Sequence, residues 1–210
     1  MKIKICGMKY KDNIESVAAL QPDYLGFIFY QGSKRNFHGE IPTLSADIKK
    51  TGVFVNEEES VILDLIQKHE LKGIQLHGDE SPAFCAALTA SNNPNLEIIK
   101  AFAVSDHFDF DQLTAYKDVC DYFLFDTKGK ERGGNGTLFD WTLLEQYPLD
   151  KPFFLSGGIG LTEADRVLSF LESPSSKYCH ALDLNSKFES EPGLKKIHEL
   201  KKFIELAKKY

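Results

Sequence analysis

The sequence predicts an α/β fold of the TIM-barrel type, the (β/α)₈ barrel, in which eight parallel strands alternate with helices and close on themselves. Short apolar runs recur along the chain, with segments of helical composition between them. Most of these runs are apolar on successive residues, which is typical of parallel strands buried on both faces. The length of 210 residues lies near the lower end of the range for this fold, roughly 200 to 400 residues.

Eight apolar runs define the predicted strands, and each is four to six residues long. Their bounds are Lys2–Cys6, Tyr24–Phe29, Thr51–Val55, Gly73–Leu76, Glu97–Ala101, Tyr122–Asp126, Pro152–Ser156 and His180–Leu184. Consecutive parallel strands need a crossover connection, which is usually a helix. We therefore expect a helix after each strand.

Helical segments do fill the intervals between these strands. In the clearest of them, Val61, Ile62, Leu65 and Ile66 form one apolar stripe. The predicted helices are Asp12–Leu20, Ile41–Lys50, Ser60–His69, Ser81–Thr89, Asp109–Lys117, Phe139–Gln146 and Thr162–Leu171.

A closing helix is predicted at the end of the chain, where apolar residues from Ile197 to Ala207 repeat at helical spacing. Six lysines between Lys195 and Lys209 occupy the other positions. We interpret them as a solvated helix face rather than a nucleic-acid patch.

The alternative fold is an open, doubly wound sheet. Its first strand normally leads into a G-x-G-x-x-G phosphate turn, whereas the first strand here leads only into Cys6-Gly7-Met8. The chain contains no convincing repeat, low-complexity tract or linker. We therefore expect a single barrel domain over residues 1–210.

Composition favours small-molecule chemistry. The 25 Lys and Arg residues are outnumbered by 31 Asp and Glu residues, for a net charge of −6. Broad nucleic-acid binding needs a positive field, and a membrane span needs about 18 or more consecutive apolar residues; the sequence has neither. We expect a phosphorylated small molecule as partner, with no nucleic acid and no membrane, and the sequence leaves open whether the protein is a monomer or a homodimer.

The cysteines indicate a reducing compartment. Cys6, Cys85, Cys120 and Cys179 form no C-x-x-C pair, so we expect free thiols and no metal site. Met1 to Gly7 reaches a glycine before an apolar signal region could form. The expected location is the cytoplasm.

Candidate site residues lie at the ends of the predicted strands, because barrel active sites are built from the loops at the C-terminal face. Cys6 and Asp126 could form a base and acid pair there, provided that the environment lowers the thiol pKa and raises the carboxyl pKa. Asp183 lies near the end of the last predicted strand. The backbone N–H groups of Gly157 and Gly158, with Asn185 and Ser186 in the next loop, could bind a phosphate.

Two further loops contain residues that could contribute to the site. Arg35, in the loop after the second strand, is the candidate for a bidentate clamp on a substrate carboxylate. Residues 129–136 contain four glycines, which suit a mobile loop over the site.

These residues, in this order, resemble the phosphoribosylanthranilate isomerases of tryptophan biosynthesis. The likeness spans nearly the whole chain. It is carried by Lys4-Ile5-Cys6-Gly7, Gly52 to Asn56, Gln75 to Glu80, Phe125-Asp126 through Trp141, Leu155 to Ile159 and Leu182 to Ser186.

The resemblance implies a cofactor-free Amadori rearrangement of N-(5-phosphoribosyl)anthranilate. It implies that Asp126 is the general acid and Cys6 the general base, and that Arg35 lies near the anthranilate carboxylate. It also implies that Gly157, Gly158, Asn185 and Ser186 bind the phosphate and that Asp183 lines the ligand pocket. His77 falls in a family motif, and both a local structural role and a ligand contact stay open for it.

Three residues depart from the family pattern: Lys9, Asn135 and Lys187 stand where threonine, threonine and glycine are common. The alternative functions are the related isomerase of the histidine pathway, whose acid and base are both aspartates, and a non-catalytic barrel that binds a phosphosugar. Cys6 after the first strand favours the anthranilate substrate over the first alternative. Because binding alone needs neither a thiolate nor a carboxylic acid, the pair of Cys6 and Asp126 weighs against the second.

Overall fold

The computed structural model describes residues 1–90, 95–105, 107–127 and 139–209. Eight parallel strands, hydrogen-bonded in sequence order, form a closed barrel, and β8 pairs with β1. The strands are β1 (Lys2–Ile5), β2 (Tyr24–Ile28), β3 (Lys49–Phe54), β4 (Gly73–Leu76), β5 (Glu97–Val104), β6 (Tyr122–Thr127), β7 (Phe153–Leu155) and β8 (Cys179–Leu184). All eight predicted strands are therefore confirmed: the bounds of β4 are identical to those predicted, and the bounds of the others differ by at most three residues.

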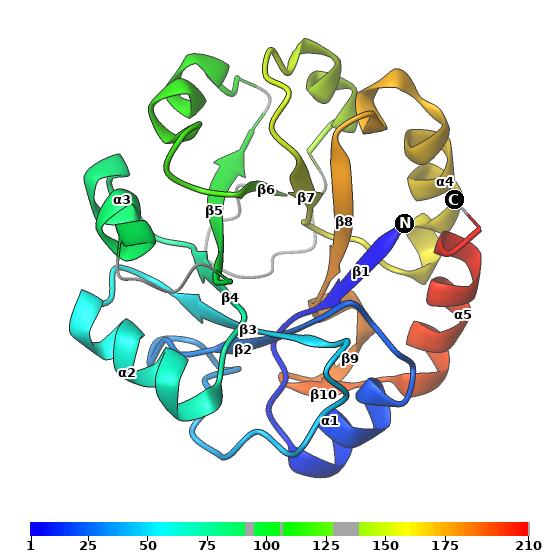
Figure 1. Cartoon of the computed structure of the whole chain (residues 1–210). Coiled ribbons are helices and arrows are strands. Elements are labelled where there is room, and N and C mark those ends of the chain that lie inside the picture. Colours follow the sequence, from blue (N-terminus) through cyan, green and yellow to red (C-terminus); the bar gives the residue numbers. More distant parts are fainter. Residues whose placement is uncertain (91–94, 106, 128–138, 210) are drawn as a thin grey trace.

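Helices lie outside the ring of strands (Figure 1). The α-helices of the described residues are α1 (Lys11–Ala18), α2 (Glu59–His69), α3 (Pro82–Ala90), α4 (Ala164–Glu172) and α5 (Ile197–Ala207). Short 3₁₀ helices span Phe110–Tyr116, Trp141–Gln146, Leu161–Glu163, Pro174–Ser176 and Ser186–Phe188. After β8, the strands β9 (Glu189–Glu191) and β10 (Leu194–Lys195) form an antiparallel pair. None of the described helices is long and apolar enough to cross a membrane.

The prediction of a helix over Ile41–Lys50 is wrong. Local hydrogen bonds hold this segment in a turn, because Asp47 N donates to Ser45 Oγ and Ile48 N donates to the Ser45 carbonyl, at 3.3 and 3.1 Å. Lys49 and Lys50 already belong to β3. The crossover from β2 to β3 is thus made without a helix.

Two other predicted helices form as 3₁₀ helices. Asp109 and Asp140 cap them, accepting from the backbone N–H groups of Asp111 and Thr142. A side chain that bonds the backbone two residues ahead offers that N–H group an alternative to the α-helical pattern. The two 3₁₀ helices are seven and six residues long.

The barrel interior is layered along its axis. Its N-terminal part is apolar and aromatic, and contains Tyr24, Ile99, Leu124, Phe154 and Ala181, all buried. Two residues further along β6, β7 and β8, the inward side chains are polar: Asp126, Ser156 and Asp183. The barrel therefore provides a dry floor beneath a polar layer at its C-terminal end.

A buried ion pair supports the loop after β4. Lys100 Nζ lies 3.0 Å from Glu80 Oε2, and the two side chains are 3% and 2% exposed. The Glu80 carboxylate also accepts from the backbone N–H groups of Asn56 and Gly78, and Lys100 donates to the Gly78 carbonyl at 2.8 Å. This pair fixes the backbone immediately after His77.

We expect Lys100→Met to lower the free energy of unfolding by about 3 to 5 kcal/mol, because it leaves the Glu80 carboxylate buried without its cation. Urea unfolding followed by circular dichroism measures the change. Lys117→Met is the matched control, since the Lys117 side chain is 43% exposed and should leave stability essentially unchanged. A loss below about 1 kcal/mol for Lys100→Met, typical of an exposed pair, would contradict this account.

Candidate active site

A pocket opens where the barrel strands end, at their C-terminal side. It is lined by seven of the eight residues that the sequence predicted for the site: Cys6, Asp126, Gly157, Gly158, Asp183, Asn185 and Ser186. Strands β1, β6, β7 and β8 therefore bring these residues together, although up to 180 positions separate them along the chain. Arg35, the eighth residue, lies beside this group, where an ion pair with Glu189 holds it.

Cys6 lies just past the end of β1 and is 3% exposed. Its backbone N–H donates to the Leu184 carbonyl at 2.8 Å, which continues the pairing of β1 with β8. Burial raises the pKa of the Cys6 thiol, and the buried cations of Lys4 and Lys195 offset part of this effect. The two cations thus favour a thiolate, whereas burial and the Asp183 carboxylate disfavour it, and the net effect is a raised pKa of Cys6.

Asp126 is the penultimate residue of β6 and lines the same pocket. Its Oδ1 accepts from the Thr127 backbone N–H at 2.9 Å. Its Oδ2 lies 3.5 Å from His77 Nε2, and the two side chains are 19% and 21% exposed. The carboxyl group is therefore oriented from both sides while remaining accessible from the pocket.

Beneath the pocket, Lys4 and Asp183 form a buried ion pair, with 2.9 Å between Nζ and Oδ1 and exposures of 0% and 5%. Burial opposes the charge on Lys4, but Asp183 and Cys6 outweigh it and raise the Lys4 pKa. Burial also raises the pKa of Asp183, and Lys4 only partly offsets it. The cation of this pair is thus strongly held beneath Cys6.

The glycines after β7 are required by geometry. Gly157 and Gly158 have φ of +89° and +66°, in the region that side chains rarely adopt. A Cβ on Gly157 would lie 2.2 Å from Thr127 Oγ1 and 2.6 Å from Thr127 N. This backbone therefore passes close to β6 at the pocket wall, with its peptide groups uncovered by side chains.

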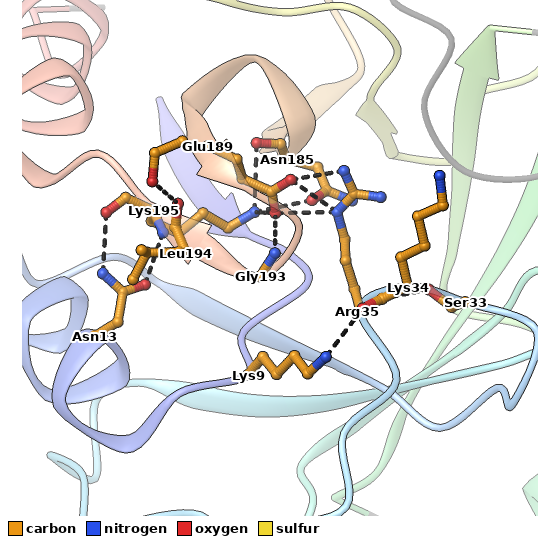
Figure 2. Close-up of polar contacts among 11 residues, drawn as sticks. Lys9, Asn13, Ser33, Lys34, Arg35, Asn185, Glu189, Gly193, Leu194 and Lys195 are labelled. Carbon is orange, nitrogen blue, oxygen red and sulfur yellow. Dashed lines mark hydrogen bonds and ion pairs between the residues drawn. The ribbon is translucent and has the colours of Figure 1, made fainter.

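Arg35 is held by Glu189, as Figure 2 shows. The Arg35 Nε donates to Glu189 Oε1 at 3.0 Å and Nη2 donates to Oε2 at 2.6 Å, which is the bidentate geometry that suits a guanidinium. The other guanidinium nitrogen, Nη1, is not used by this ion pair. Arg35 and Asn185 also close over Gly7, where a Cβ would lie 2.7 Å from Arg35 Cδ and 2.8 Å from Asn185 Oδ1.

Lys195 completes this network from the other side (Figure 2). Its Nζ donates to Glu189 Oε1 at 2.7 Å and to Asn185 Oδ1 at 2.8 Å. Burial lowers the pKa of Lys195. Burial opposes the charge of Glu189, but Arg35 and Lys195 outweigh it and lower the Glu189 pKa. The buried Glu189 carboxylate thus pairs with two cations, Arg35 and Lys195. Together the three side chains carry a net positive charge next to the predicted phosphate loops.

The interpretation of the C-terminal lysines as a solvated helix face is wrong for Lys195. This residue lies in β10, is 3% exposed, and exchanges two backbone-to-side-chain hydrogen bonds with Asn13 at 2.8 and 2.9 Å. The Pro192-Gly193 turn folds it back onto the site, with Gly193 at φ +90°. The other five lysines are exposed.

Sequence reasoning also missed Lys4, Gln75 and Glu189, and left His77 open. The available signal was position: Lys4 precedes Cys6 by two residues and Gln75 precedes His77 by two, so each pair points to the same side of a strand. A charged or amide side chain inside an apolar strand needs a buried partner. Lys187, one of the departures from the family pattern, lines the pocket.

The glycine-rich segment 129–136 and Asn135 lie outside the described residues. Among the residues that the structure does describe, His, Cys, Asp and Glu side chains nowhere gather in a group of three that could hold a metal ion.

Comparison with known proteins shows a family that the chain matches over nearly its whole length. The family model for N-(5'-phosphoribosyl)anthranilate (PRA) isomerase matches residues 3–206. The N-(5'-phosphoribosyl)anthranilate isomerase of Parabacteroides distasonis is 41% identical over 98% of this chain and 92% of its own.

Two solved structures superpose over the whole of both chains. The first is phosphoribosyl anthranilate isomerase in complex with reduced 1-(o-carboxyphenylamino)-1-deoxyribulose 5-phosphate, with a TM-score of 0.81 and 29% identity. The second shows monomers generated from the dimeric enzyme of Thermotoga maritima, with a TM-score of 0.79 and 28% identity.

Proposed function

The chain belongs to the N-(5'-phosphoribosyl)anthranilate isomerase family, and we propose that it carries out the isomerisation with Cys6 as the general base and Asp126 as the general acid. The enzyme converts N-(5-phosphoribosyl)anthranilate into 1-(2-carboxyphenylamino)-1-deoxyribulose 5-phosphate in tryptophan biosynthesis. The observation that supports the two roles is that a buried thiol and a pocket-lining carboxyl group, from strands at different parts of the barrel, line one pocket.

The reaction needs two proton transfers on the sugar. Asp126 donates a proton to the furanose ring oxygen; the bond from this oxygen to C1 breaks, and the nitrogen lone pair forms the C1=N⁺ bond of an open-chain iminium. The Cys6 thiolate then removes the proton from C2, which the iminium has acidified, and the C–H electron pair forms the C1=C2 bond as the nitrogen recovers its lone pair. The resulting enolamine tautomerises to the aminoketone.

The substrate's two anions have separate anchors in this proposal. The phosphate binds the backbone of Gly157 and Gly158 together with Asn185 and Ser186, in the loops after β7 and β8 that commonly bind phosphate in barrels. The anthranilate carboxylate binds Arg35 through the guanidinium edge that Glu189 leaves free. Asp183 lines the pocket below the sugar.

We also infer the setting in which this reaction runs. The whole chain acts as one catalytic domain in the cytoplasm, as a monomer or a homodimer. The monomers generated from the related dimeric Thermotoga maritima enzyme support both states. Free Cys6, Cys85, Cys120 and Cys179 are consistent with a reducing compartment.

The test of the acid-base assignment is the loss of fluorescence of freshly generated phosphoribosylanthranilate, followed in parallel for the wild type, Cys6→Ser and Asp126→Asn. We expect rapid loss only with the wild type. Circular dichroism establishes that all three proteins are folded. Turnover at the wild-type rate by either variant would eliminate that residue from its role.

Arg35→Ala should raise KM for phosphoribosylanthranilate by roughly 10- to 100-fold, as removing a charge-assisted hydrogen bond of about 1.5 to 3 kcal/mol implies. The effect on kcat should be smaller, because the clamp acts far from C1 and C2. Steady-state kinetics separates the two constants. Unchanged kinetics would refute the clamp, and Arg166→Ala, on helix α4, is the control for removing an arginine elsewhere.

Glu189→Gln tests whether the clamp must be held. The substitution keeps the shape of the side chain but leaves Arg35 and Lys195 as two cations with no carboxylate between them, so the guanidinium should lose its fixed orientation. We expect a rise in KM of roughly 3- to 10-fold, of the order of 1 kcal/mol. A lower KM would show that Glu189 competes with the substrate for Arg35 rather than orienting it.

A further inference from the structure

A chain of polar contacts runs from β1 to β6 along the pocket, which Gln75, His77 and Asp126 line. Lys4 Nζ donates to Gln75 Oε1 at 2.7 Å. The Gln75 amide nitrogen lies 2.7 Å from His77 Nδ1, and His77 Nε2 lies 3.5 Å from Asp126 Oδ2. Lys4 and Gln75 are 0% and 2% exposed, so water does not compete for the contact between them.

The direction of every hydrogen bond in this chain is determined by its first member. An ammonium group is a donor only, so the Gln75 oxygen must face Lys4. The Gln75 amide nitrogen, which is also a donor only, then faces His77. The Nδ1 atom of His77 must therefore accept this hydrogen bond, so it carries no hydrogen. A neutral imidazole has one hydrogen, which in this case is on Nε2, the nitrogen that faces Asp126.

We propose that Lys4 and Gln75 are positioning residues that hold His77 as the neutral Nε2–H tautomer and direct this hydrogen at the Asp126 carboxyl group. The proposal rests on the role proposed above for Asp126. The Thr127 N–H already holds Asp126 Oδ1 at 2.9 Å, so the His77 hydrogen fixes the second oxygen. The 3.5 Å distance is long for a hydrogen bond, and such contacts often tighten when ligand binds.

Asp183 holds Lys4, the first residue in the chain of contacts from Lys4 through Gln75 and His77 to Asp126, which we call the relay. Its Oδ1 lies 2.9 Å from Lys4 Nζ, and the two residues are register partners on adjacent strands. Despite burial, Asp183 and Cys6 raise the Lys4 pKa, so the ammonium stays a donor throughout the physiological range. Gln75 accordingly keeps one orientation, and so does the ring beyond it.

The tautomer can be read directly in the ligand-free protein. In ¹⁵N-labelled wild type at neutral pH, long-range ¹H–¹⁵N correlation spectra distinguish an imidazole with hydrogen on Nε2, on Nδ1, or on both. The His77 signals are assigned by their loss in His77→Asn, and the exposed His38 supplies the spectrum of a solvated ring. We expect His77 to be the Nε2–H tautomer; an Nδ1–H tautomer or an imidazolium would overturn the proposal.

Gln75→Glu reverses the chain, because a carboxylate accepts from both neighbours and requires a hydrogen on His77 Nδ1. We expect the His77 spectrum to change accordingly and kcat to fall by roughly tenfold or more, with little change in KM. Gln67→Glu makes the same substitution on an exposed position of α2 and should change neither.

The outcomes separate this inference from the proposed function. If the spectrum changes in Gln75→Glu while kcat stays at the wild-type value, the relay does not serve the reaction and the positioning role is overturned. If Gln75→Glu does not fold, the wild-type spectrum still decides the tautomer. That spectrum requires no turnover, so it stands even if Asp126→Asn shows that another group is the acid.

Discussion

Cys6→Ser should lower kcat by roughly 10²- to 10⁴-fold, the contribution of a positioned general base, and leave KM nearly unchanged. Serine fits the same buried site, but its hydroxyl does not ionise in the range where a thiol does. The phosphate loops and Arg35 are untouched, so binding persists. Rapid-mixing and steady-state fluorescence measure the loss of turnover. Cys179→Ser is the matched control, because Cys179 is the first residue of β8 and lies at the end of this strand away from the pocket.

The pH dependence provides a second test of Cys6. Burial raises the pKa of this thiol above the ordinary value near ~8.5, and only the thiolate can accept the C2 proton. The reaction also needs Asp126 with its proton, and carboxyl groups ordinarily ionise at lower pH than thiols. Between the two pKa values the growing fraction of thiolate and the shrinking fraction of protonated carboxyl group offset each other as pH rises, so kcat/KM should stay level through neutral pH. Above the raised pKa of Cys6 the thiolate fraction no longer grows, and kcat/KM should fall. A fall that begins below the ordinary thiol pKa would contradict a thiolate base with a raised pKa.

The barrel itself could be predicted because each strand carries its own signal. A strand buried on both faces must be apolar along its length, so the eight runs were visible without long-range information. The connection over Ile41–Lys50 could not be predicted in the same way. Its composition fits a helix, whereas the Ser45 hydroxyl and carbonyl bond to the next residues and keep the segment in a turn.

The site was partly predictable for a similar reason. Cys6, Asp126 and Gly157 lie at strand ends, and topology alone brings strand ends together. Lys195 could not be placed, because lysines next to a helical repeat are usually solvated. It is buried only because the β9–β10 pair turns it towards Glu189, 6 residues away in the chain, and towards Asn185, 10 residues away. Such contacts depend on a backbone turn that the spacing of apolar residues does not indicate.

The relay from Lys4 to His77 illustrates an intermediate case. The alternation in Lys4-Ile5-Cys6 and in Gln75-Leu76-His77 shows that polar residues share the inward side of β1 and β4. Closure of the barrel determines which of these polar residues contact each other, because β1 and β4 are not neighbours in the sheet. The sequence therefore contained the groups of the relay, and only the fold supplied its direction.

Asp126→Asn should lower kcat/KM by roughly 10²- to 10⁴-fold, because an amide cannot give a proton to the ring oxygen. The amide is close in shape to the carboxyl group, and its oxygen can still accept from Thr127 N, so the fold should persist. Asp150→Asn, whose side chain is 71% exposed, is the control for the same substitution at the surface. Wild-type turnover by Asp126→Asn would show that another group protonates the sugar.

A deuterium isotope effect on kcat/KM distinguishes the two catalytic residues, because they act on successive steps. With deuterium at C2 of the ribose, the step assigned to Cys6 breaks the labelled bond, whereas the step assigned to Asp126 does not. Cys6→Ser slows abstraction, so the isotope effect should rise towards its full primary value. Asp126→Asn slows the earlier ring opening, so the isotope effect should fall towards unity. If the two variants shifted the isotope effect in the same direction, Cys6 and Asp126 could not act on separate steps.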